Sequence, residues 1–317
     1  MQVVILAAGK GSRLHPITLD RSKAMLPILG KPMIGRVAED IVNNGLTDFI
    51  IVTSPNDLFI KNFFQNEWDR DIRIQFVDQP KRLGMADALR YAAPYIREDF
   101  VLTACDNLIS TQFIQLMLDK WREFTKINGL LTLMPVSREE ISSVGIVEME
   151  GEWVKRIVEK PSPETAPSNI ASLPLYIFSI QILEYLKEVK LSSRGEYELQ
   201  DAIQILIDKQ GFVSGIQTTF RHTVTNAVDL LAINKHYLTH GNEKPQIMPQ
   251  HVGPGTHLIT PLHIEENVTI GHDCIIGPNV YIERNCQIGS YVKLENVVVL
   301  REVTIPDNVS IYNRVYA

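Results

Sequence analysis

The last part of the chain carries an apolar residue at every sixth position. The set runs without a gap through Val252, Leu258, Ile264, Ile270, Ile276, Ile282, Ile288, Leu294 and Leu300. A second apolar or small set lies two positions earlier and includes Leu262, Val268, Cys274, Val280, Cys286, Val292 and Val298. Strands of a sandwich would vary in length and in turn spacing, whereas a constant period of six is typical of a parallel β-helix. We therefore expect a left-handed parallel β-helix over residues 251–317.

Each hexapeptide forms one side of a triangular coil, so residues 18 apart should stack. Val252, Ile270 and Ile288 would form one internal ladder, and Ile264, Ile282 and Leu300 another, with the phase slipping by one after Leu300. Cys274 and Cys286 are 12 residues apart. They should lie on different sides of the coil and remain unpaired.

The first two-thirds of the chain alternate between strand and helix signals. Strands are predicted over 3–6, 49–52, 72–77 and 100–103, and helices over 34–44 and 86–96. This alternation predicts an α/β, Rossmann-like domain over residues 1–240 with a mostly parallel sheet. Residues 241–245 are predicted to form a linker. Ligands bind beyond the carboxyl ends of such strands, so the loops after the first and fourth strands could share one crevice.

The overall charge of −6 makes the chain a poor general binder of nucleic acid or of an anionic membrane. No apolar stretch is long enough to span a bilayer. The three cysteines, without a secretory signal, favour a cytoplasmic location. An anionic substrate would need a local basic site.

A glycine-rich loop follows the first predicted strand and comprises Ala8, Gly9, Lys10, Gly11, Ser12 and Arg13. Its glycines let the backbone approach a polyphosphate, and Arg13 adds a bidentate donor. A dinucleotide fingerprint would need a third glycine where Arg13 stands, and a Walker loop would need a Gly-Lys-Ser/Thr run that is missing here. A glycine turn with solvated basic residues is the simpler interpretation of the loop taken alone.

The residues that follow change this interpretation. Residues 21–27 have the sequence Arg-Ser-Lys-Ala-Met-Leu-Pro, and Lys31-Pro32 come shortly after. Together with the loop, this run resembles the sugar-nucleotide pyrophosphorylase family, and within it the glucose-1-phosphate thymidylyltransferases and uridylyltransferases. The resemblance covers about the first 235 residues. It implies that a sugar 1-phosphate, with glucose 1-phosphate expected, reacts with UTP or dTTP to give an NDP-sugar and pyrophosphate.

The resemblance also implies roles for single residues. Arg13 and Lys23 would neutralise charge on the triphosphate and the leaving pyrophosphate, and Asp106 would be catalytic by holding Mg²⁺. Ala8, Gly9 and Gly11 would form the phosphate loop. The base would be read by Gln79 and Gly84, and the sugar phosphate would be bound by Gly145, Glu159 and Lys160.

Two departures leave alternatives open. Leu173-Pro174 stands where relatives have Thr-Gly, and Thr223 stands where relatives have a second metal-binding aspartate, with Asn226 as a weak substitute. A non-catalytic nucleotide-sugar-binding or regulatory homologue is therefore one alternative. An acyltransferase using His272 in the β-helix is another, although three to four coils without a long loop fit an oligomerising role better. We expect a homo-oligomer.

Overall fold

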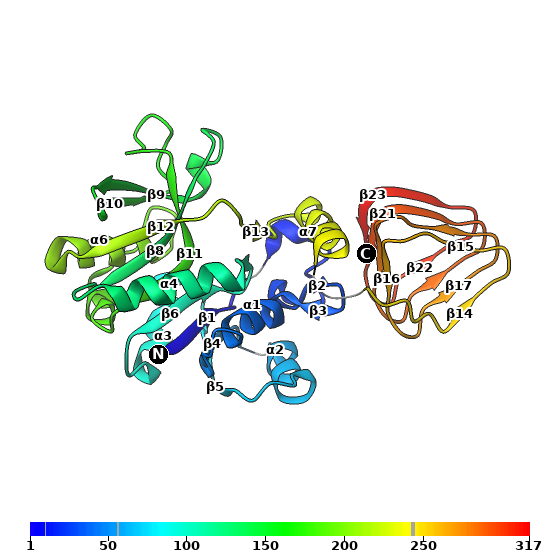
Figure 1. The fold of residues 1–317 in the computed structure, drawn as a ribbon, viewed down its shortest axis with the longest axis horizontal. Helices are drawn as coiled ribbons and strands as arrows, with labels where there is room; N and C mark the ends of the chain where they lie inside the picture. Colours follow the sequence, from blue (N-terminus) through cyan, green and yellow to red (C-terminus); the bar gives the residue numbers. More distant parts are fainter. Residues whose placement is uncertain (10, 56, 242–244) are drawn as a thin grey trace. The chain divides into compact units, whose positions relative to one another are not determined.

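A computed structural model describes residues 1–9, 11–55, 57–241 and 245–317. Lys10 and the centre of the predicted linker, Asn242 to Lys244, therefore lie outside the described residues. The chain divides into two compact units (Figure 1). The sheet unit comprises residues 1–9 and 34–222, and the coil unit comprises residues 10–33 and 223–317. The segment 10–33 thus groups with the C-terminal part of the chain and not with the strand that precedes it.

The sheet unit is built on a nine-stranded sheet of order β5-β4-β1-β6-β11-β8-β12-β10-β9. The strands are β1 (Gln2–Leu6), β4 (Asp48–Thr53), β5 (Arg73–Asp78), β6 (Phe100–Ala104), β8 (Gly129–Pro135), β9 (Gly145–Glu150), β10 (Trp153–Glu159), β11 (Ile170–Phe178) and β12 (Val213–Gln217). The helices are α1 (Met33–Val42), α2 (Leu58–Asn62), α3 (Met85–Ala92), α4 (Thr111–Glu123), α5 (Ile182–Tyr185) and α6 (Leu199–Gln210), and α4 crosses the strands in Figure 1.

The four strands predicted from the sequence form the parallel half of this sheet. β1 pairs in parallel with β4 and β6, and β4 pairs in parallel with β5. Every residue of β1 is buried, as expected for a parallel strand covered on both faces. The other half is mixed, because β11 runs antiparallel to β6, β8 and β9 while β12 runs parallel to β8. The predicted α/β architecture is confirmed.

β11 accommodates the proline that departs from the family pattern. The register of β11 against β8 shifts between Leu173 and Tyr176, so Pro174 lies in a bulge of a central strand. A proline lacks the N–H that a regular ladder requires, and a bulge removes that requirement. Leu173 is fully buried in the core. The local fold therefore accommodates both Leu173 and Pro174.

The coil unit contains the predicted parallel β-helix and the helix α7 (Ala227–His240). Its short strands are β14 (His251–Val252), β15 (His257–Leu258), β16 (Leu262–Ile264), β17 (Thr269–Ile270), β18 (Ile275–Ile276), β19 (Val280–Ile282), β20 (Gln287–Ile288), β21 (Lys293–Val299), β22 (Thr304–Ile305) and β23 (Ser310–Tyr316). Strands one coil apart pair in parallel, and Val252, Ile270 and Ile288 stack as predicted. Cys105, Cys274 and Cys286 are free thiols, as expected.

The second predicted ladder was wrong in its last member. Ile282 pairs with Val299 and not with Leu300, because the phase slips earlier, between Leu294 and Val297. Residues with positive φ mark the corners of the coil, and they occur at positions 267, 273, 279, 285, 291, 296, 302 and 308. The interval shortens from six to five at Asn296. Asparagine tolerates the left-handed conformation, so its position was a usable signal for the slip.

The segment 10–33 contains the short 3-10 helices η1 (Ser12–Leu14) and η2 (Lys23–Met25) and the ribbon of β2 (Pro27–Ile28) with β3 (Lys31–Pro32). The other short elements are η3 (Phe63–Glu67), η4 (Ala93–Tyr95), β7 (Asn107–Leu108), η5 (Ile141–Ser143), η6 (Leu186–Glu188) and β13 (His222–Thr223). No helix among the described residues is long and apolar enough to cross a membrane.

Candidate active site

The glycine-rich loop is divided between the two units. Ala8 and Gly9 follow β1 in the sheet unit, where Arg82 donates from Nε to the carbonyl oxygen of Ala8 at 2.7 Å. A Cβ added to Gly9 would meet nothing within 4 Å, so open space lies beside this part of the loop. An arginine anchored beside an open backbone turn suits an anion.

In the coil unit, the structure brings Gly11 next to Lys23. Gly11 has a φ of 66°, and a Cβ placed on it would lie 3.0 Å from the Cβ of Lys23. Thr18 fixes this turn by donating from its hydroxyl to the carbonyl oxygen of Gly11 at 2.8 Å. Arg13 is exposed on η1. Glycine is needed here both for the left-handed backbone and for the close approach of Lys23.

Gln79 lies directly after β5, and its side-chain amide is held within the protein. Nε2 donates to the carboxylate of Asp87 at 2.8 Å and to the carbonyl oxygen of Gly84 at 3.2 Å. Both partners are acceptors, so the orientation of the amide is fixed. Gly84 has a φ of 101°, and a Cβ there would lie 2.5 Å from the carbonyl oxygen of Tyr197. No other residue fits at position 84 without a backbone shift.

A cleft of about 450 Å³ opens beside Gln79. It lies past the carboxyl ends of β4 and β5, and it is lined by Ser54, Pro55, Gln79, Pro80, Lys81 and Arg82. Because both amide N–H groups of Gln79 are engaged, its carbonyl oxygen is the group that the amide offers to the cleft. The cleft therefore combines the carbonyl oxygen of Gln79 and the hydroxyl of Ser54 with two cationic side chains.

Asp106 follows β6 and has a cationic neighbour that the sequence analysis missed. The partial burial of Arg221 lowers the pKa of its guanidinium, while the nearby charge of Asp106 raises it. Arginine remains protonated in proteins, so a fixed positive charge lies near the Asp106 carboxylate. Arg221 precedes Thr223 by two residues. The resemblance points to an acidic residue at position 223, and it gives no indication of this basic one.

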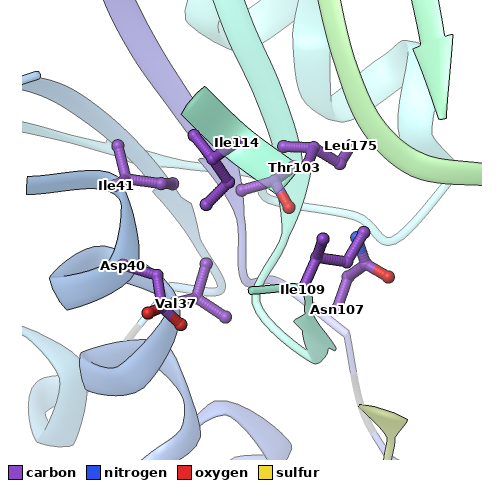
Figure 2. A pocket seen from close by; sticks show the side chains of 8 residues that line it. All are labelled: Val37, Asp40, Ile41, Thr103, Asn107, Ile109, Ile114 and Leu175. Atoms are coloured by element: carbon purple, nitrogen blue, oxygen red, sulfur yellow. The ribbon is translucent and has the colours of Figure 1, made fainter. Parts of the chain in front are cut away.

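A small cavity lies beside Asn107, the neighbour of Asp106 in the chain (Figure 2). Its volume is about 10 Å³, which is room for no more than one water. Both polar side-chain atoms of Asn107 are buried without a hydrogen-bond partner among the described residues. The cavity is therefore too small for a substrate.

Glu159 is the centre of a charged cluster at the end of β10. Its Oε1 lies 3.4 Å from Nζ of Lys160 and 3.6 Å from Nη2 of Arg194, which in turn contacts Glu198 at 2.7 Å. A Cβ on Gly145 would lie 3.1 Å from Glu159 Oε2. Oε2 is buried and has no hydrogen-bond partner among the described residues. Burial raises the pKa of Glu159, against the opposing charge of Lys160.

This cluster contains the hydrogen-bond acceptors and cations that could bind a phosphorylated sugar. Oε2 of Glu159 can accept from a hydroxyl, and Lys160 and Arg194 can donate to a phosphate. The sequence analysis predicted Glu159 and Lys160 as site residues and assigned no site role to residues 194–201. Arg194 and Glu198 were therefore missed as site residues.

The strand register brings Asp106 and Glu159 to the same edge of the sheet. β11 is antiparallel to β6, so its first residues extend beyond the carboxyl end of β6. There Ser172 pairs with Gly145, which pairs with Glu159. The charge of Glu159 raises the pKa of Tyr176 while that of Arg221 lowers it, after the larger effect of burial. Arg221 and Glu159 are thus both within electrostatic reach of one tyrosine.

The donor set fits Mg²⁺ only if the substrate supplies most of the ligands. Among the residues that the structure describes, no cluster of three or more histidine, cysteine or acidic side chains is arranged to hold a metal. Asn226 is the N-cap of α7, where its Oδ1 accepts from the backbone N–H groups of Val228 and Asp229. Mg²⁺ commonly uses one or two carboxylates, with phosphates and waters completing the octahedron. Asp106 can supply one.

The architecture and the motifs place the chain in a known class of proteins. Residues 2–236, which contain the mixed α/β sheet and the glycine loop after its first strand, match the model of the nucleotidyl transferase family. The chain belongs to the nucleotidyl transferase family. Residues 258–316 match the model described as the GMPPB C-terminal domain.

Two curated relatives illustrate the similarity. The bifunctional protein GlmU of Methanococcus vannielii is 30% identical over 281 residues, which cover 87% of this chain and 61% of that protein. The chain thus spans less than two-thirds of this relative. UTP–glucose-1-phosphate uridylyltransferase AglF of Haloferax volcanii is 31% identical over 208 residues, covering 65% of this chain and 84% of AglF.

Among solved structures, UDP-glucose pyrophosphorylase complexed with UDP-glucose is similar with a TM-score of 0.68 and 25% identity. The match covers 74% of this chain and 97% of that protein. These matches bear out the resemblance to sugar-nucleotide pyrophosphorylases that the N-terminal motifs predicted.

Proposed function

We propose that this chain transfers a nucleotidyl group from UTP or dTTP to a sugar 1-phosphate, with glucose 1-phosphate as the expected acceptor. The observation that carries the proposal is the convergence at one sheet edge of Asp106 and the Glu159 cluster, with the Gln79 cleft past the carboxyl ends of neighbouring strands. A charged sugar-phosphate site and a nucleotide cleft are the two compartments that such a transfer needs.

The reaction is one in-line displacement. A phosphate oxygen of the sugar 1-phosphate forms a bond to the α-phosphorus of the triphosphate, and the bond from that phosphorus to the leaving pyrophosphate breaks. Lys160 and Arg194 orient the attacking phosphate, while Glu159 accepts from sugar hydroxyls. Arg13 and Lys23 stabilise the charge on the triphosphate and on the departing pyrophosphate. Bound Mg²⁺, held by Asp106, would supply further charge stabilisation at the phosphates.

The fixed amide of Gln79 supports uracil or thymine as the base. Its free carbonyl oxygen accepts from an N–H donor, and uracil and thymine carry one at N3. Cytosine has a lone pair at N3, which would oppose that oxygen. The two cations at the rim, Lys81 and Arg82, are within the same cleft and suit the phosphates.

The closest competing proposal is binding without turnover. It is favoured by Thr223 in place of an acidic residue and by the positive charge of Arg221 near Asp106. Four triphosphates should be tested against several sugar 1-phosphates with Mg²⁺, with release of pyrophosphate as the readout. We expect release with UTP or dTTP. Tight binding of UDP-glucose without release of pyrophosphate from any pair would favour the binding protein instead.

We further propose that the chain forms a homo-oligomer through its β-helix. Among the strands of the described residues, the terminal strand β23 pairs only with β21. An open strand edge at the end of a coil favours covering by another chain.

A further inference from the structure

The segment 10–33 carries Gly11, Arg13 and Lys23, and its partners lie in the coil unit. These three residues are the phosphate-binding part of the proposed site. Their positions therefore depend on how the segment is fixed to the β-helix and to α7. Two sets of contacts, one on each side of Lys23, hold the segment.

The first contact is a buried ion pair between Arg21 and Glu283. Nη1 of Arg21 lies 2.8 Å from Oε1 and 3.0 Å from Oε2 of Glu283, and the two side chains are 4% and 6% exposed. The backbone N–H of Arg301 also donates to Oε2 at 2.8 Å. Arg21 is two residues before Lys23. Both charges are removed from water, so displacement of either side chain would leave the other charge buried without its ion-pair partner.

The second set of contacts follows Lys23. The backbone N–H of Leu29 donates to Oδ1 of Asn234 in α7 at 3.0 Å, and Nδ2 of Asn234 donates to the carbonyl oxygen of Pro27 at 3.2 Å. The backbone N–H of Gly30 donates to the hydroxyl of Tyr281 at 3.2 Å. That hydroxyl donates in turn to Glu265. Tyr281 is fully buried, so its hydroxyl contacts Gly30 away from solvent.

Between these anchors the chain has little freedom. Ser22 is the N-cap of η2, in which Lys23 is the first residue, and the backbone N–H of Met25 donates to the carbonyl oxygen of Ser22. The lysine that faces Gly11 is therefore held by a short helical turn whose two flanks are bonded to the β-helix and α7. Displacement of either flank would move Lys23 relative to Gly11, which its Cβ approaches closely.

We propose that Glu283 of the β-helix is a positioning residue for Lys23. The β-helix would then hold the phosphate-binding segment 10–33 in place, in addition to its proposed role in oligomerisation. The expected effect of Glu283 on kcat rests on the proposed nucleotidyl transfer. The structural part of the proposal does not depend on it, because binding of pyrophosphate by Lys23 can be measured without turnover. Preorganised charge loses effect when its position is no longer fixed.

The test compares Glu283→Gln with Lys23→Ala and with the double variant. We expect Glu283→Gln to lower kcat about tenfold and to weaken pyrophosphate binding in calorimetry, without changing the KM for the sugar 1-phosphate, whose site lies in the sheet unit. In the double variant the effect of Glu283→Gln should disappear, because the lysine that it positions is gone. Additive effects of the two substitutions would overturn the proposal.

Two further variants separate positioning from loss of fold. Ile276→Ala removes buried volume from the interior of the β-helix, and it should lower the melting temperature without changing pyrophosphate affinity. Tyr281→Phe keeps the ring but removes the hydroxyl that accepts from Gly30, and it should reproduce the Glu283→Gln effect in milder form. An equal loss of pyrophosphate binding in Ile276→Ala would show a general effect of destabilisation and overturn the role of Glu283. If neither the wild type nor any variant shows turnover, but pyrophosphate affinity changes across the variants as expected, the proposed function is wrong and the positioning role of Glu283 stands.

Discussion

Gln79 donates from Nε2 to the buried carboxylate of Asp87 at 2.8 Å, and this bond decides which atom of the amide faces the nucleotide cleft. Asp87 lies in the first turn of α3, only 8% exposed. A carboxylate accepts and cannot donate, so it selects the nitrogen of the amide and leaves the oxygen for the ligand. In the proposed function, the base preference would thus be set by this pair of residues and not by Gln79 alone.

Replacement of Asp87 by alanine should weaken the choice between bases. Without the carboxylate the amide can rotate, and the ratio of kcat/KM for UTP over CTP should fall about tenfold, the scale of one hydrogen bond to a charged group. Asp87→Asn is the matched control, since its amide oxygen still accepts, and its ratio should fall less. An unchanged ratio in Asp87→Ala would exclude a role of the pair in base selection.

Replacement of Lys23 by alanine should reduce turnover on the order of a hundredfold, the scale of one lost charge-stabilising donor. The melting temperature should change little, because Lys23 is only partly buried. Initial rates at saturating substrates measure the effect. Wild-type turnover in this variant would mean that Lys23 is an ordinary surface residue.

The KM for the sugar 1-phosphate should depend on pH through Glu159. Burial raises the pKa of this carboxyl, so it becomes protonated at a higher pH than an ordinary glutamate. As the pH falls through that raised pKa, Glu159 loses its capacity to accept from a second sugar hydroxyl, and the KM should rise. Glu159→Gln should abolish this inflection. An inflection that persists in the variant would assign the titration to another group.

The same shift has a consequence for stability with the opposite sign. A carboxyl whose pKa is higher in the folded than in the unfolded state binds more protons when folded, so its contribution is fully present below the unfolded pKa. That contribution is lost as the pH rises through the folded pKa. The difference in melting temperature between Glu159→Gln and the wild type should therefore grow in favour of the variant over this window, as differential scanning calorimetry would measure.

Introduction of an acidic residue at position 223 should tighten the dependence on Mg²⁺. Asp106 is the carboxylate proposed to hold the cation, and a second one would add charge to the site. Thr223→Asp should therefore lower the Mg²⁺ concentration that gives half the maximal rate. Asn226→Ala is the companion variant, and as the loss of a helix cap it should cost about 1 kcal/mol of stability while leaving the Mg²⁺ dependence unchanged. The reverse outcome, in which only Asn226→Ala changes the Mg²⁺ dependence, would make Asn226 the ligand.

The sequence predicted the elements because their signals are local. The apolar runs gave the strands β1, β4, β5 and β6, and the period of six gave the β-helix and its first ladder. The phase slip was misplaced by a few residues, because Val298 and Leu300 continue the apolar pattern beyond the true slip. There the corner conformation of Asn296 was decisive, and it is a backbone property.

The missed site residues have another cause. Arg221 lies near the charge of Asp106, and Arg194 contacts Glu159, and both neighbours are distant in sequence. Such neighbours are brought together by the pairing of β6, β11 and β9. The grouping of residues 10–33 with the β-helix was missed for the same reason. Arg21 and Glu283 are 262 positions apart, and neither position is marked in the sequence as a partner of the other. The domain division at residue 240 remains a proposal. A truncation there would remove Glu283 and Tyr281, which contact the segment that carries Lys23.

The central claim is that the α-phosphorus of UTP or dTTP passes to a sugar 1-phosphate. The direct measurement supplies the purified chain, Mg²⁺ and glucose 1-phosphate with UTP or dTTP labelled either at the α- or at the γ-phosphorus. We expect the α-label to appear in a nucleoside diphosphate sugar and the γ-label to appear in pyrophosphate, in equal amounts. Label in orthophosphate alone, or no transfer with any sugar 1-phosphate, would contradict it.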